Sequence, residues 1–228
     1  MNRLTENKVV LVTRRTRLDD LVARFNTVSQ AKFCVEHLGA DFSEYVREHE
    51  QYRASVSATV ATLEQIGRLQ VLDRSFLRNF IFGNDDTLVV PGQDGLVANT
   101  VKYTTTQQVL GVNPDPARWE GVLLPFAVGD LEKILPEVFA DRRPIKEVTM
   151  AKAELNDGQK LYAVNDLFIG VHSHTSGALY NQRWREERAA LVQRSDRIDG
   201  SGFDRLVSQP DDRRGEGCER GIRGQVQS

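Results

Sequence analysis

Short apolar runs that alternate with segments of helical spacing constrain the fold of this sequence more than any other feature. Residues 9–12 form a continuous apolar run, which is typical of a strand buried on both faces. Residues 87–90 form a second strand-like run, and a helical pattern follows each of the two. Because strands that alternate with helices form parallel sheets, we predict an α/β fold with an N-terminal Rossmann-like domain.

The segment between the two runs is predicted to contain three helices. The first follows the strand at residues 18–25, and the second extends to Gly39, a residue type that commonly ends helices. A longer third helix begins near Ser43. The apolar residues at helical spacing are Leu18, Leu21, Val22, Phe25, Ala31, Val35, Leu38, Val56, Val60, Leu63 and Ile66.

The second half of the chain is predicted to be one helix followed by β-structure. The helix is expected at residues 131–139, and Val148 and Met150 then alternate with neighbours that are polar or small. Residues 156–158 read Asn-Asp-Gly, a strong turn signal, and the apolar run at residues 161–169 follows them. We therefore predict a β-hairpin in this part of the chain.

Composition excludes several classes of partner. The chain has 228 residues and a net charge of -2, so it offers no broad basic surface, and nucleic acid is not expected as a partner. No signal peptide or apolar stretch of membrane-spanning length is present, so no membrane partner is expected either. Cys34 and Cys218 lie far apart and give neither a disulfide framework nor metal-ligand spacing. We expect a reduced, cytoplasmic protein without a metal site of its own.

An acidic glycine turn follows the second apolar run, where residues 92–95 read Gly-Gln-Asp-Gly. Glycine lets phosphates approach the backbone closely, and a helix N-terminus favours anions. In this position Asp94 could orient or deprotonate a hydroxyl, or hold Mg²⁺ near phosphates. It could instead only cap the helix that follows. Arg14 to Arg17 follow the first strand, as a basic loop for phosphate or as the solvated start of a helix.

The acidic turn resembles the Gly-Gly-Asp-Gly turn of the NAD kinase family, which shares a superfamily with diacylglycerol and sphingosine kinases. Gln93 replaces the second glycine of that turn. Residues 111–113, Gly-Val-Asn, are similar to the strand that follows this helix in the family. Residues 161–170 resemble its second motif, in which an Asn-Asp pair, here Asn165 and Asp166, opens a strand.

The resemblance implies an enzyme that phosphorylates the 2′-hydroxyl of the adenosine ribose of NAD to give NADP. ATP with Mg²⁺, or polyphosphate, would donate the phosphoryl group. Asp94 is the implied catalytic residue, and Asn165 and Asp166 would contact the adenine and ribose. The implied nucleotide-binding residues are Gly92, Gln93, Gly95, Asn113, Asn165 and Asp166. Family members also assemble as homo-oligomers, which we expect for an intact member.

Three regions are expected along the chain. Residues 1–118 would form the α/β nucleotide-binding domain, and residues 119–188 a partial, β-rich substrate-binding domain. Residues 189–228 fit neither, because Arg, Asp, Gly, Gln and Ser dominate there without any period, as in a disordered tail. Bases that can encode residues 191–208, read one nucleotide later, give an apolar strand and a Gly-Ser-Thr-Gly turn that resembles the third family motif. We hypothesise that a one-base insertion or deletion, natural or from sequencing, displaced the reading frame near Ala189.

The sequence lacks the motifs of two other nucleotide-binding classes and leaves two alternative functions open. Neither a phosphate-binding Gly-x-x-x-x-Gly-Lys-Ser/Thr loop nor a Gly-x-Gly-x-x-Gly motif after the first strand is present, so P-loop NTPases and classical dehydrogenases are poorly supported. A lipid or sugar kinase of the same superfamily is the alternative enzyme. A non-catalytic, nucleotide-binding remnant is the alternative of another class, because the loss of the third motif would impair the activity.

Overall fold

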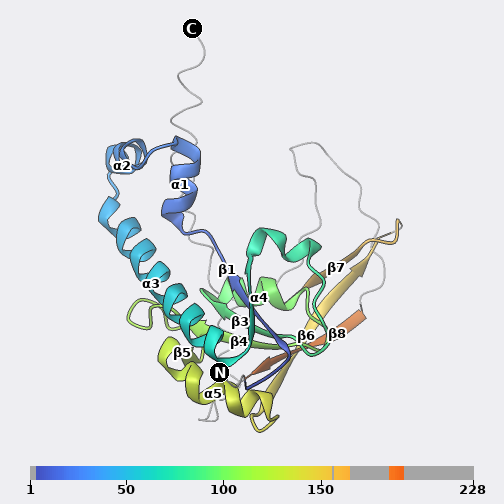
Figure 1. Ribbon diagram of the computed structural model, residues 1–228. Helices are drawn as coiled ribbons and strands as arrows, with labels where there is room; N and C mark the ends of the chain where they lie inside the picture. The colour runs from blue at the N-terminus through green and yellow to red at the C-terminus, as the bar shows by residue number, and fades with distance from the viewer. Residues whose placement is uncertain (1–3, 156, 165–184, 193–228) are drawn as a thin grey trace.

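The two apolar runs form β1 (Lys8–Thr13) and β3 (Thr87–Pro91), which are neighbouring inner strands of one sheet. The computed structural model describes residues 4–155, 157–164 and 185–192. Within them, eight strands form a sheet in the order β2-β1-β3-β4-β8-β6-β7, with β5 also beside β4 (Figure 1). The remaining strands are β2 (Arg68–Asp73), β4 (Gln108–Asn113), β5 (Phe126–Ala127), β6 (Ile145–Glu154), β7 (Lys160–Ala163) and β8 (Arg185–Val192).

The pairing of the strands confirms the predicted α/β class. β1 pairs in parallel with β2 and β3, β3 with β4, and β4 with β5. β6 pairs antiparallel with β7, which confirms the predicted hairpin, and antiparallel with β8. Since β8 also pairs with β4, the strands of both predicted domains belong to one sheet, and the domain boundary near residue 118 stays a prediction.

The predicted helices are present close to their expected positions. α1 starts after Thr16, whose hydroxyl and Asp19 form a capping box, and α3 starts after Asp41, whose carboxylate accepts a hydrogen bond from the Ser43 amide. The helices are α1 (Arg17–Phe25), α2 (Val28–His37), α3 (Phe42–Ile66), α4 (Asp94–Val101) and α5 (Leu131–Phe139), with short 3₁₀ turns η1 (Arg74–Asn79) and η2 (Val128–Asp130).

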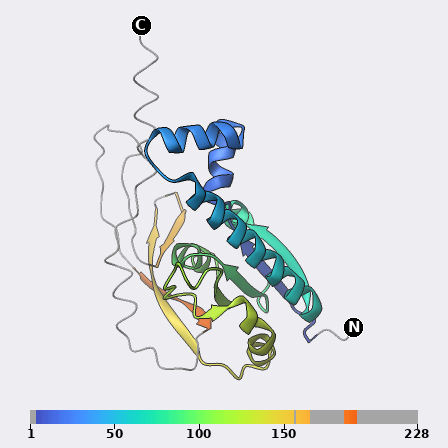
Figure 2. The same cartoon turned by 90° about the vertical axis from the view of Figure 1, so that its left-hand side faces the viewer.

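Helices cover both faces of the parallel strands, as the continuous apolar runs require. Val9 and Leu11 of β1 belong to the core that contains apolar residues of α3 and α5. Val10 and Val12 face the opposite way, into the core that contains apolar residues of α4 and η1. Figure 2 shows α3 and α5 on one side of the sheet. The carboxyl ends of β1 and β3 are thereby held by two packed layers, and the candidate sites lie at these ends.

Three strands, β2, β5 and β8, were not predicted from the sequence. β2 is an edge strand in which three of six residues are exposed, so it carries no continuous apolar run. β8 extends through residues 189–192, which we expected to belong to the aberrant tail. Residues 165–184 and 193–228 lie outside the described part of the chain. The structure therefore does not test the reading-frame hypothesis, which concerns residues after Ala189. None of the helices in the described part combines the length and apolar character that crossing a bilayer requires.

Candidate functional site

Asp94 lies at the start of α4, directly after the buried strand β3. Gln93 occupies the N-cap position of α4 and makes no capping hydrogen bond with its side chain. The carboxylate of Asp94 is turned toward the loop between β4 and β5, where its Oδ1 accepts a 2.7 Å hydrogen bond from the amide of Leu123. The carboxylate therefore holds a neighbouring loop, and helix capping does not account for its position.

Burial raises the pKa of the Asp94 carboxyl above its usual value. The backbone amides of Leu123 and Val122 favour the ionised form and oppose this change, whereas the negative charge of Glu120 adds to it. The net result is a carboxyl that binds its proton more tightly than an exposed aspartate does. Such a group is better suited to accept a proton near neutral pH than an ordinary aspartate.

The loop that Asp94 holds is packed closely against β4. A Cβ on Gly111 would lie 1.9 Å from the carbonyl oxygen of Leu123, so only glycine permits this approach. Buried Asn113 donates from Nδ2 to the carbonyl of Trp119 at 2.8 Å and accepts at Oδ1 from the amide of Asp115 at 3.0 Å. Asp94, Gly111 and Asn113, which the sequence singled out, thus converge on the loop of residues 114–125.

The two glycines of the acidic turn differ in their surroundings. The amide of Gly92 donates to the carbonyl of Val112, and a Cβ on Gly92 would come within 2.7 Å of the Leu96 side chain. Gly95 is exposed, and a Cβ there would meet no atom of the described residues within 4 Å. No described residue therefore blocks a ligand on the side of the turn at Gly95. Asn165 and Asp166 lie outside the described residues.

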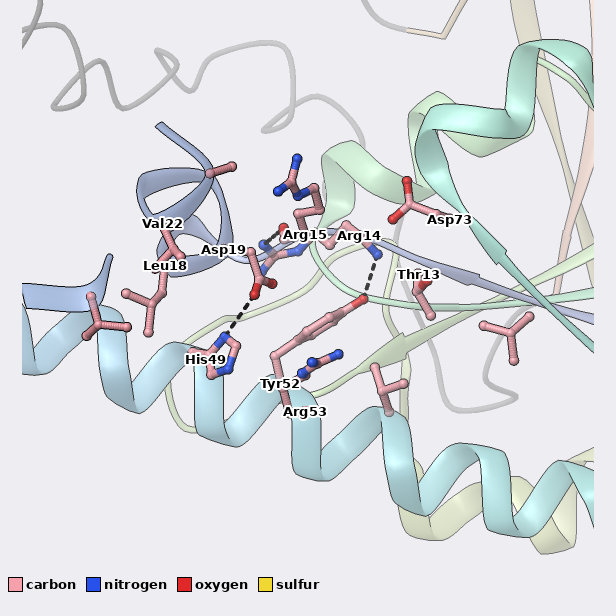
Figure 3. A pocket seen from close by; sticks show the side chains of 14 residues that line it. Thr13, Arg14, Arg15, Leu18, Asp19, Val22, His49, Tyr52, Arg53 and Asp73 are labelled. Atoms are coloured by element: carbon pink, nitrogen blue, oxygen red, sulfur yellow. Dashed lines mark hydrogen bonds and ion pairs between the residues drawn. The ribbon is translucent and has the colours of Figure 1, made fainter. Parts of the chain in front are cut away.

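A cavity of about 670 Å³ lies at the carboxyl ends of β1 and β2. α1 and α3 form its walls (Figure 3). β1 lies beside β3, so the cavity and the acidic turn both lie at the carboxyl ends of neighbouring strands. Asp94 does not line the cavity. The lining residues come from distant parts of the sequence: residues 13–15, 18–28, 49–56 and 71–73 contribute them.

Two arginines of the basic cluster after β1 share one buried carboxylate. Arg14 pairs with Glu48 of α3 at 2.9 Å, and Arg17 also pairs with Glu48. Burial opposes ionisation of Glu48, but the hydrogen bonds from Arg17 and Arg14 outweigh it and lower the pKa of Glu48 below its usual value. Arg15 remains exposed and has only a loose pair with exposed Asp20 at 3.6 Å. The cluster therefore leaves Arg15 as its open cation.

His49 presents one ring nitrogen to a small polar network. Its Nδ1 lies 2.8 Å from Oγ1 of buried Thr16 and 3.6 Å from Oδ1 of Asp19. Because the hydroxyl of Thr16 donates to Oδ2 of Asp19 at 3.0 Å, its oxygen accepts from His49, so Nδ1 carries the proton. In the neutral ring, Nε2 is then the acceptor nitrogen, and His49 is one of the residues that line the cavity. No sequence pattern marked this residue.

The hydrogen bonds around Thr16 favour the ionised form of Asp19. Burial opposes ionisation of Asp19, but hydrogen bonds from the backbone and side chain of Thr16 outweigh it, and the pKa lies below its usual value. The charge of Arg53, and that of His49 when its ring is protonated, favour the carboxylate further. Asp19 is thus ionised and engaged at neutral pH.

Comparisons with known proteins identify no family. No known family pattern matches the sequence, and no curated protein matches it. Among solved structures, yeast NADH kinase complexed with NADH is similar at 14% sequence identity with a TM-score of 0.30. The match covers 71% of this chain and 48% of the yeast chain, so this chain spans about half the length of that structure. A likeness at this level does not support an argument about function.

Proposed function

We propose that this chain is an NAD kinase-like phosphotransferase that transfers the γ-phosphoryl group of ATP to the 2′-hydroxyl of the adenosine ribose of NAD. The observation that carries the proposal is the position of Asp94. This partly buried residue follows the inner parallel strand β3, at the carboxyl ends of the strands, where ligands of such folds bind. It is also the first residue of α4, and a helix N-terminus favours phosphate. This position supports a phosphoryl-transfer site better than a plain turn.

Asp94 would act as the general base. In the transfer, the ribose oxygen forms a bond to the γ-phosphorus, the bond from that phosphorus to the leaving oxygen of ADP breaks, and the hydroxyl proton passes to Asp94. The raised pKa of Asp94 favours this role, because a base is most effective when its pKa lies near the operating pH. The remaining catalysis is positioning and charge neutralisation, for which the open backbone at Gly95 leaves room.

The acidic turn also fits a magnesium ion that arrives with the nucleotide. Mg²⁺ commonly binds through one or two carboxylates together with substrate phosphates, and it supplies charge neutralisation on those phosphates. Asp94 offers one carboxylate for it. Among the described residues, no group of three His, Cys, Asp or Glu side chains forms a metal site made by protein alone.

The other roles are proposed from the family resemblance. Gly92, Gln93, Gly95 and Asn113 would bind the nucleotide phosphates and nucleoside, and Asn165 and Asp166 the adenine and ribose of NAD. A cytoplasmic location, a homo-oligomeric intact form, and the three regions at residues 1–118, 119–188 and 189–228 are proposed on the same basis. The chemistry proposed for Asp94 does not depend on any of these further roles.

The test is NADP formation from ATP, Mg²⁺ and NAD by the purified chain and by a version with the reading frame restored after residue 189. Asp94→Asn in the active version should lower the rate by about 10²–10⁴-fold, the usual contribution of a general base. Asp85→Asn, an exposed acid on the amino-terminal side of β3, serves as the matched control and should keep the rate. Activity that survives Asp94→Asn would refute the assignment of the base.

One observation favours a non-catalytic binding protein as the second candidate. The hydrogen bond from Leu123 gives Asp94 a structural task that needs no substrate. A rise of the melting temperature with ATP or NAD, without NADP formation by either version, would support this candidate. Phosphorylation of a lipid or sugar acceptor in place of NAD would instead support the alternative kinases.

A further inference from the structure

We infer that the cavity at the carboxyl ends of β1 and β2 is a binding site for a phosphate ester that carries an aromatic or apolar body. The site is separate from Asp94 and does not depend on catalysis there. Its volume of about 670 Å³ lies within the usual range of small-ligand pockets. Its lining combines an apolar wall with converging polar groups, which is the composition that such pockets share.

The apolar wall comes from two helices that face each other across the cavity. Leu18 and Val22 of α1 lie on one side, and Val56 of α3 lies on the other. Val28 at the start of α2 and Val71 of β2 complete this wall, and both are more than half exposed despite their apolar side chains. An aromatic or apolar ligand body would remove these side chains from water.

The charges of the cavity favour an anion because its acids already accept hydrogen bonds, whereas two of its cations, Arg15 and Arg53, have only a loose ion pair and a longer-range interaction with Asp19. Asp19 binds Thr16 in the capping box of α1. Asp73 accepts hydrogen bonds from the amide and hydroxyl of Ser75 at 2.9 and 2.6 Å. Within the described residues Arg53 makes no hydrogen bond or ion pair, and Arg15 has only its loose pair with Asp20.

His49 adds a directed polar group one turn before Arg53 on α3. Its Nε2 is an acceptor in the neutral ring, since Nδ1 donates to Thr16. Figure 3 shows His49, Tyr52 and Arg53 on α3 across from Asp19 and Leu18 on α1. A guanidinium and an imidazole acceptor on one helix face can bind a phosphate and a neighbouring hydroxyl or amine. Arg14 also lines the cavity, but its guanidinium is already paired with Glu48.

The test is calorimetric titration of the full chain with AMP and with phenyl phosphate, beside adenosine and inorganic phosphate. Both esters should bind, and adenosine and inorganic phosphate should each bind at least about 10-fold more weakly, because each lacks one half of the recognised chemistry. Inorganic phosphate that binds as tightly as the esters would mean an adventitious ion only. Failure of both esters to bind would overturn the inference.

Two variants locate the binding. Arg53→Gln should weaken ester binding by about 10-fold or more, since a charge-assisted contact is lost. Arg47→Gln lies on the same helix, carries an exposed side chain and does not line the cavity, so it is the matched control. Unchanged binding in Arg53→Gln, with an unchanged melting temperature, would overturn the inference. Asp94→Asn should leave ester binding intact, which separates this result from a failure of the proposed kinase activity.

Discussion

The backbone amide of Leu123 donates a 2.7 Å hydrogen bond to Oδ1 of Asp94, which joins the acidic turn after β3 to the loop after β4. The carboxylate proposed to take up a proton therefore also holds a loop of the fold. Gly111 lets the same loop approach β4, because any larger residue would collide with the carbonyl of Leu123. Changes in the turn and changes in the loop should consequently affect each other.

Asp94→Asn should leave the protein at least as stable as the parent at neutral pH. Burial raises the pKa of Asp94 above its usual value of 3.8, so the folded state binds this proton more tightly than the unfolded state. The resulting stability is complete below the unfolded pKa and is lost as the pH rises through the raised pKa. Asparagine keeps an acceptor for Leu123 without the charge. Melting temperatures between about pH 4 and pH 7 should diverge in favour of asparagine as the pH rises; convergence or the opposite trend would contradict this expectation.

Gly111→Ala should destabilise the protein by about 1–3 kcal/mol or more, the cost of overpacking against backbone. The new Cβ would lie 1.9 Å from the carbonyl oxygen of Leu123, which cannot rotate away as a side chain would. Urea unfolding measures the effect. Gly129→Ala is the matched control, because a Cβ there meets none of the described atoms within 4 Å and the change should stay within about 0.5 kcal/mol. Equal stability of the two variants would show that the loop can move freely.

Gly95→Ala should separate stability from activity. A Cβ at this position meets no atom of the described part of the chain within 4 Å, and alanine is the better helix former, so stability should rise by up to about 1 kcal/mol. If phosphates approach this face of the turn, the methyl group displaces them, and a displacement of 1 Å can lower the rate by about 100-fold. NADP formation and urea unfolding of one preparation give both quantities. An active, stabilised variant would place the phosphates elsewhere.

Glu48→Ala should lower the free energy of unfolding by about 3–5 kcal/mol, because it leaves Arg14 buried without its partner charge. The side chains of Arg14 and Glu48 are only 9% and 5% exposed. Glu50→Ala, an exposed acid two residues further on α3, should change little. Since the pKa of Glu48 lies below its usual 4.5, the stability that the carboxylate supplies is present above pH 4.5 and is lost as the pH falls through the lowered pKa. Urea midpoints measured from neutral to acidic pH test both statements.

The buried strands and amphipathic helices could be predicted because each carries its own period. The runs of β1 and β3 are continuous because helices cover both faces, and Leu18 to Phe25 repeat helically because α1 buries one side. β2 could not be predicted in this way. As an exposed edge strand it carries Arg, Gln and Asp between short apolar stretches of one or two residues, and its place depends on pairing with β1.

The acidic turn could be found from sequence, whereas the cavity could not. Residues 92–95 are contiguous, so their chemistry is visible in a short motif. The cavity brings His49 and Arg53 of α3 against Leu18 of α1 and the end of β2, and only the packing of helices on the sheet creates this combination. Glu48 shows the same limit, since nothing local indicates that it pairs with two arginines that follow β1.

The shared edge of β4 has a consequence for synthesis on the ribosome. Gln108 and Val109 pair with β8, while Val112 and Asn113 pair with β5, so the two ends of this edge are completed at different times. β5 is made soon after β4, but the first half of this edge of β4, opposite the edge that pairs with β3, stays unpaired until residues 185–192 have left the ribosome. The hairpin β6–β7 also joins the parallel strands through β8. A nascent chain that pauses before residue 185 would therefore expose an open strand edge and an undocked hairpin, both of which invite pairing with neighbouring chains.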